Sequence, residues 1–223
     1  MDCISECGFG CFISIKNFLN YHLALLSLVA FFLAILGTIS YSDIAFGVGN
    51  APWMHGSING VYEFMFGLKS VAGKEPDLTV YSSTVYNSPD CQESFCKVCG
   101  KAGRSVVGCL IVALVFLFFS FLISLKRTFG DSGVWKFLGF LTSGVAFAFG
   151  CAAYNTHRPC YFEVRDWLST SVAELSQQNS HDFSYSYGYD SGAKEALTAF
   201  ILAIYIAFFN LLIPVATATA DAK

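Results

Sequence analysis

Four cysteines are spaced in a way that suits disulfide formation. Cys91, Cys96 and Cys99 form a C-x4-C-x2-C run, and Cys160 follows much later in the chain. Four cysteines in an oxidising compartment make an even set that allows three pairings. We expect at least one disulfide among them. A bond from Cys160 to the run would tie two separate segments together and restrict their relative motion.

A metal site is the alternative use of the same cysteines. His157 or His181 would then supply a further ligand to the run. Ligand spacing of this kind is typical of zinc sites in reducing compartments, whereas we expect these residues in an oxidising one. We therefore favour disulfides, and we predict no metal and no cofactor.

The N-terminal residues carry a second group of cysteines with a different chemistry. Cys3, Cys7 and Cys11 precede an amphipathic stretch at residues 12–19, close to the first apolar run. Cysteines next to a membrane surface are candidates for acylation. The alternative is that they are free thiols on a short disordered tail.

The sequence contains no catalytic motif. It has no Gly-rich phosphate loop, no His-Glu-x-x-His and no Gly-x-Ser-x-Gly. The 13 Lys and Arg residues against 16 Asp and Glu residues leave a net charge of -3, which excludes the basic field that a nucleic-acid partner requires. We predict a protein that is not an enzyme and does not bind nucleic acid.

The elements that must position these residues are membrane-spanning helices. Of the 223 residues, 55% are hydrophobic and 13% are charged, about half the charged fraction of a soluble domain. A bilayer core of about 30 Å needs roughly 20 apolar residues in a helix. Four segments meet this test without a charged residue: 23–40, 105–125, 137–154 and 196–216. We predict an all-α, left-handed four-helix membrane bundle with the lipid bilayer as its first partner.

Small residues recur every fourth position in three of the four spans, which favours close helix packing. The residues predicted to pack are Ser105, Cys109, Ala113, Gly144, Ala148, Ala152, Ala199, Ala203 and Ala207. Packing within one chain is the preferred interpretation, and a lateral homo-oligomer is the alternative. Asn210 is the main strongly polar side chain inside a span, and we expect it to make an interhelical hydrogen bond.

The orientation follows from the basic residues of the shortest connection, residues 126–136. Positive charge in short loops marks the cytosolic side. The tails at 1–22 and 217–223 are then cytosolic as well, and the loops at 41–104 and 155–195 are exterior. We expect an integral protein of the plasma membrane or of an endomembrane.

The first exterior loop carries a strand pattern and the second a helical one. Residues 58–71 and 78–86 alternate as strands do, with a turn at 73–76, which predicts a small antiparallel sheet. Residues 162–175 predict a short helix that lies on the sheet or on the membrane surface. The Ser- and Tyr-rich segment 180–190 suits an aromatic belt at the headgroups or a partner-binding face.

Two short motifs resemble the claudin, peripheral myelin protein and amastin superfamily. Cys99-Gly-Lys-Ala-Gly-Arg104 precedes the second span, and Tyr187-Gly188-Tyr189-Asp190-Ser191-Gly192 precedes the fourth. The four-span layout with a large, β-rich first loop is also similar. The family's Gly-Leu-Trp and Cys-Cys signature is not matched at Gly67-Leu68-Lys69. The resemblance implies a non-enzymatic surface protein that packs laterally or contacts neighbouring membrane proteins.

Three functions agree with these observations. The first is a surface structural or adhesion protein, or an auxiliary subunit of a larger membrane complex, that contacts other membrane proteins or itself through disulfide-stapled exterior loops. The second is a subunit of a small oligomeric channel or transporter, against which the uncharged spans argue. The third is a metal-binding membrane protein.

Overall fold

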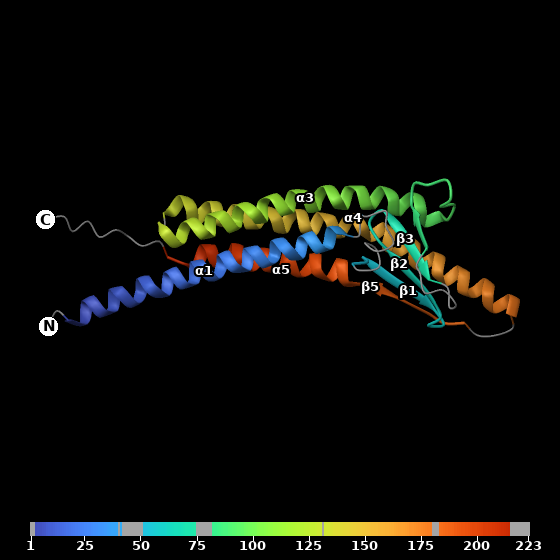
Figure 1. Cartoon of the computed structure of the whole chain (residues 1–223), viewed down its shortest axis with the longest axis horizontal. Coiled ribbons are helices and arrows are strands. Elements are labelled where there is room, and N and C mark those ends of the chain that lie inside the picture. Colours follow the sequence, from blue (N-terminus) through green and yellow to red (C-terminus); the bar gives the residue numbers. More distant parts are fainter. Residues whose placement is uncertain are drawn as a thin grey trace. The chain divides into compact units, whose positions relative to one another are not determined.

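The computed structural model describes residues 3–39, 41, 51–74, 82–130, 132–179 and 183–214, with the backbone alone at 3–14 and 178–179. The described elements are α1 Cys3–Ile39, β1 Met54–Ile58, β2 Tyr62–Phe66, β3 Ser70–Lys74, β4 Ser82–Val85, α3 Ser94–Phe129, α4 Gly133–Asn179, β5 Tyr185–Tyr189 and α5 Ser191–Leu212 (Figure 1). They fall into two compact units. We call residues 33–112 and 149–198 the sheet unit, and residues 1–32, 113–148 and 199–223 the helical unit.

Within the described residues, α1, α3, α4 and α5 are each long and apolar enough to cross a membrane. Large apolar side chains on these helices are exposed, among them Phe32 at 56%, Ile111 at 54% and Phe208 at 57%. So much exposed apolar surface is unfavourable in water and favourable against acyl chains. The helices have the properties of an integral membrane protein, as the sequence predicts.

Two of the helices are longer than the sequence pattern predicts. α1 begins at Cys3, so residues 3–22 are helical and not a disordered tail. α4 runs on past residue 154 and includes the predicted separate helix at 162–175. Pro159 removes one backbone hydrogen bond inside α4. Beyond it, Val164, Leu168 and Val172 bury one face of the helix, and this burial stabilises the continuation.

The predicted turn at 126–136 is mostly helical. α3 ends at Phe129 and α4 begins at Gly133, so Lys126 and Arg127 belong to the last turn of α3. Lys126 is exposed, whereas Arg127 is buried and donates a hydrogen bond to Asn210 Oδ1. The predicted interhelical hydrogen bond of Asn210 is confirmed. The sequence analysis did not anticipate that its donor is a guanidinium.

Hydroxyl groups link three helices of the helical unit. Ser120 Oγ of α3 lies 3.3 Å from Ser27 Oγ of α1 and 2.7 Å from Ser143 Oγ of α4. All three side chains are buried. Interhelical hydroxyl contacts of this kind stabilise helix association where water is absent.

The nine predicted packing residues differ in burial. Ala113 and the three α5 residues Ala199, Ala203 and Ala207 are fully buried. Cys109 and Gly144 are partly buried, and Ser105, Ala148 and Ala152 are exposed. The predicted packing face of α4 is therefore corrected. The buried small residues of this helix are Gly139, Ser143, Ala146, Gly150 and Ala153.

The strands form an antiparallel sheet in the order β4-β3-β2-β1-β5. The predicted small antiparallel sheet is thus present, but one of its strands comes from the second loop. β5 pairs with β1, with Met54 opposite Tyr189 and Ile58 opposite Tyr185. Residues 185–189 are therefore a sheet strand. The sequence did not predict this strand, and the aromatic belt or partner-binding face expected for 180–190 stays a prediction.

The strand boundaries also differ from the prediction at 58–71. β1 and β2 are joined through Asn59 and Gly60, whose φ angles are 53° and 69°, as the Asn-Gly hairpin turn requires. The predicted turn at 73–76 is wrong at Gly73 and Lys74, which belong to β3. Residues 75–81, which include the first part of the predicted strand 78–86, lie outside the described residues.

The sheet is covered by the continuation of α4 (Figure 1). Leu168 of α4 is fully buried and lies so close to Gly56 of β1 that a Cβ there would be 2.8 Å from Leu168 Cδ1. Trp53, Met54 and Phe66 are fully buried in the same unit. The prediction that 162–175 lies on the sheet is correct in placement, although the helix is not a separate one.

Candidate functional site

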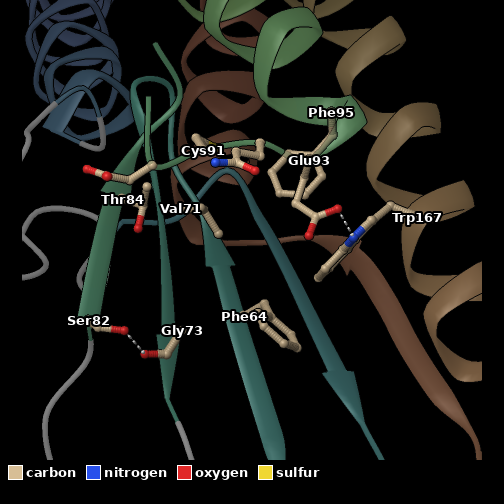
Figure 2. A pocket seen from close by; sticks show the side chains of 11 residues that line it. Phe64, Val71, Gly73, Ser82, Thr84, Cys91, Glu93, Phe95 and Trp167 are labelled. Carbon is tan, nitrogen blue, oxygen red and sulfur yellow. Dashed lines mark hydrogen bonds between the residues drawn. The ribbon is translucent and has the colours of Figure 1, made fainter. Parts of the chain in front are cut away.

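An open groove of about 390 Å³ runs over the sheet unit. Figure 2 shows its walls. Strands β2, β3 and β4 contribute Phe64, Val71, Gly73, Ser82 and Thr84. The segment before α3 and the first turn of that helix contribute Asp90, Cys91, Gln92, Glu93 and Phe95, and α4 contributes Trp167. Residues far apart in the chain thus line one surface.

Trp167 is the centre of the aromatic wall. Its ring lies edge-to-face with Phe95 at a centroid distance of 5.0 Å and with Phe64 at 5.5 Å. The indole Nε1 donates a hydrogen bond of 2.9 Å to Glu93 Oε2, as the dashed line in Figure 2 marks. Because the ring is held on two sides and the N–H is bonded, the wall is preorganised for contact.

The two disulfides hold this groove in shape. Cys91 pairs with Cys96 at a Cα distance of 5.9 Å, and Cys99 pairs with Cys160 at 4.7 Å. The first bond closes the segment that forms one rim of the groove. The second joins α3 to α4, the helix that carries Trp167. The expectation of at least one disulfide is confirmed, and one of the two bonds joins Cys160 to the run through Cys99.

The metal alternative is contradicted by these bonds, because all four sulfurs are paired with one another. Among the described residues, no three His, Cys, Asp or Glu side chains are grouped to hold a metal ion. His157, the proposed extra ligand, is buried with its ring 4.8 Å from that of Trp53. His181 lies outside the described residues.

The charge of the groove is acidic. Asp90 and Glu93 are both exposed on its rim, and Ser88 Oγ lies 2.8 Å from Asp90 Oδ2. Of the described lining residues, none is a histidine or a lysine that would serve as a base or nucleophile. The groove combines an aromatic wall with a carboxylate rim, which suits binding of a basic or aromatic segment.

Buried tyrosines support the groove and the sheet from behind. Tyr86 is 2% exposed, donates a hydrogen bond of 3.1 Å to Gly67 O, and packs edge-to-face on Phe95. Tyr187 of β5 donates one of 3.0 Å to Tyr161 O of α4. Burial raises the pKa of both Tyr86 and Tyr187 above the ordinary value, so both stay neutral donors at physiological pH.

The N-terminal acylation candidates lie on a helix. Cys3, Cys7 and Cys11 are one turn apart in the backbone of α1. Their side chains lie outside the described part of the structure, so acylation stays a prediction.

Sequence reasoning missed the central pair of the groove, Trp167 and Glu93. Glu93 directly precedes α3 and Trp167 lies on α4, 74 residues apart in the chain. The only signal in the sequence was the helical spacing of apolar residues in 162–175, a set that includes Trp167. Nothing in that period identifies its partner.

No protein-family model and no curated protein matches this chain.

Proposed function

We propose that this chain is a non-enzymatic tetraspan membrane protein, a left-handed bundle whose sheet unit faces the exterior or a lumen and binds another protein. It would act as a surface structural or adhesion protein, or as an auxiliary subunit of a larger membrane complex. The observation that carries the proposal is the aromatic and acidic groove over the sheet, held by two disulfides. Its occupant is a neighbouring membrane protein or a second copy of this chain.

Preorganisation of the groove supports this proposal. Binding proteins lose affinity when they must order side chains on contact. Here the indole of Trp167 is bonded to Glu93 and packed on Phe64 and Phe95 before any partner arrives. Aromatic anchors of this kind dominate the binding energy at protein interfaces. This role is also the one that the resemblance to the claudin and amastin superfamily implies.

The proposal is tested by placing charge and bulk in the groove without disturbing the core. Ser82 lines the groove and is exposed, whereas its neighbour Ser83 is exposed and does not line it. Successive side chains of a strand point to opposite faces. Ser82→Arg and Ser83→Arg therefore introduce the same residue on the same strand, but only the first enters the groove.

The measurement is co-purification in mild detergent of two differently tagged copies, together with crosslinking of neighbouring membrane proteins in intact cells. We expect Ser82→Arg to lower one of these associations at least tenfold, because a guanidinium and its bulk obstruct the groove. Ser83→Arg should behave like the parent. Equal association in all three proteins would contradict the proposal.

A channel or transporter subunit is the second candidate, and a specific observation bears on it. The helical unit buries hydroxyls at Ser27, Ser120 and Ser143 and a guanidinium at Arg127, and polar side chains at membrane depth often mark a pathway. These groups bond to one another and to Asn210, which favours helix association instead. Ion flux through proteoliposomes that is lost in Ser120→Ala would favour the second candidate.

A further inference from the structure

A second groove lies between α3 and α4 within the sheet unit. Its volume is about 480 Å³. α3 lines it with Lys97, Val98, Lys101, Ala102 and Ser105. α4 lines it with Thr156 and Pro159. No carboxylate is among these lining residues.

The groove lies where both helices change from apolar to polar sequence. The uncharged run of α3 begins at Ser105, and that of α4 ends at Tyr154, two residues before Thr156. The Cys99–Cys160 disulfide joins the helices at this level. In a membrane, this is the depth of lipid headgroups and of the first acyl methylenes.

Two lysines form the polar end of the groove. Lys97 and Lys101 are exposed and stand one helical turn apart, about 6 Å along the axis. Within the described residues, neither ammonium is paired with a carboxylate. Lysine stems cover apolar surface while their ammonium groups extend to the headgroup level. A phosphate placed between the two would accept hydrogen bonds from both.

The apolar end of the groove has room for a chain. Gly108 lies on the same face of α3 as Ser105 and Lys101, because it follows them by three and seven residues. No atom lies within 4 Å of the position that a Cβ on Gly108 would take. On α4, Ala152 lies one turn before Thr156 and is exposed. Neither residue carries a large side chain that would obstruct an acyl chain extending from the groove along the apolar runs.

We propose that this groove binds one anionic glycerophospholipid, with its phosphate between Lys97 and Lys101 and one acyl chain along Gly108 and Ala152. Charge complementarity and the space beside Gly108 select a lipid over a soluble anion, because only a lipid uses both ends of the groove. The site is separate from the groove over the sheet, and the proposal does not depend on the function proposed above.

The test is native mass spectrometry of the full-length protein in detergent, equilibrated with palmitoyl-oleoyl phosphatidylglycerol or with the matching phosphatidylcholine. We expect the parent to retain one phosphatidylglycerol. The double variant K97Q/K101Q should bind it about 30-fold more weakly, since each basic residue contributes roughly fivefold at a membrane surface. Lys194→Gln is the matched control. Lys194 is likewise an exposed lysine just before an apolar run, but it does not line this groove.

A second pair of variants tests the acyl path without changing charge. Gly108→Leu and Ala152→Leu fill the path from either helix, and each should weaken phosphatidylglycerol binding about tenfold by displacing methylenes. Excess glycerol 3-phosphate should not displace the lipid. Full binding by K97Q/K101Q overturns the proposal, as does equal loss in Lys194→Gln. If both leucine variants bind normally while glycerol 3-phosphate competes, the site recognises phosphate alone, which also overturns it.

Discussion

At Gly103 the backbones of α3 and of the segment between β2 and β3 come into direct contact. A Cβ at this position would lie 1.6 Å from Leu68 O, which is backbone and has no alternative rotamer. Only a residue without a side chain fits there. Gly108 lies five residues further along the same helix, and no atom lies within 4 Å of the position that its Cβ would take.

The two glycines predict opposite outcomes for one substitution. Gly103→Ala should destabilise the protein by about 3 kcal/mol or more, because the backbone of Leu68 must move. Gly108→Ala should be neutral, or stabilising by up to about 1 kcal/mol, because alanine favours a helix. Thermal unfolding in detergent, followed by tryptophan fluorescence, measures both. A Gly103→Ala protein as stable as the parent would show that the close approach is absent.

Asn210 is the second residue whose surroundings predict a measurable effect. It is fully buried and accepts a hydrogen bond from the buried guanidinium of Arg127. Asn210→Leu should cost about 2 kcal/mol, the scale of a hydrogen bond to a charged group. Asn17→Leu is the control, since Asn17 is exposed on α1. Equal unfolding temperatures for the two variants would argue against the interhelical bond.

At the scale of elements, the two disulfides differ in the length of chain that they close. Cys99–Cys160 spans 61 residues and joins α3 to α4, whereas Cys91–Cys96 spans 5 residues within one segment. A longer closed loop removes more entropy from the unfolded chain. The long-range bond is therefore the main covalent stabiliser of the sheet unit.

Removal of each bond tests this ranking. Loss of Cys99–Cys160 through the double serine variant should cost about 4 kcal/mol and loss of Cys91–Cys96 about 2 kcal/mol. Surface abundance and protease resistance should fall in the same order. Cys151→Ser controls for the substitution itself, because Cys151 is an exposed free thiol. If both double variants match Cys151→Ser, the disulfides do not stabilise the fold.

At the scale of the whole molecule, the proposed four-span topology requires both termini on one side of the membrane. The exposed Lys126 at the end of α3 still favours the cytosol for that side. The burial of Arg127 removes one of the basic residues on which the orientation was predicted. The predicted orientation therefore rests on Lys126 and Lys136, and a direct measurement of sidedness tests it.

Cysteine labelling in intact cells supplies that measurement. In a background lacking Cys3, Cys7, Cys11, Cys109 and Cys151, we expect Asn87→Cys to react with a membrane-impermeant maleimide, since Asn87 is exposed in the sheet unit. An epitope tag at the C-terminus should bind antibody only after permeabilisation. Antibody binding to the tag on intact cells would reverse the orientation and the proposed exterior role of the sheet.

The local content of the sequence was sufficient for the four long apolar helices, for the presence of a small antiparallel sheet and for the expectation of a disulfide among four cysteines. Apolar runs of about 20 residues and alternating strand patterns are properties of neighbouring residues, and an even cysteine set limits the pairings to three. The boundary between β1 and β2 was missed because an alternating pattern is read from neighbouring residues alone. The Asn59-Gly60 turn lies inside a run that alternates well enough to resemble one strand.

Other features were decided only by the tertiary structure. β5 becomes a strand because it pairs with β1, and α4 continues past Pro159 because the sheet buries its far half. Arg127 meets Asn210, and Trp167 meets Glu93, across 83 and 74 residues of chain. A sequence pattern reports the periodicity of one segment. These contacts depend instead on which two segments fold against each other. The contacts stabilise either segment only when the other is packed against it.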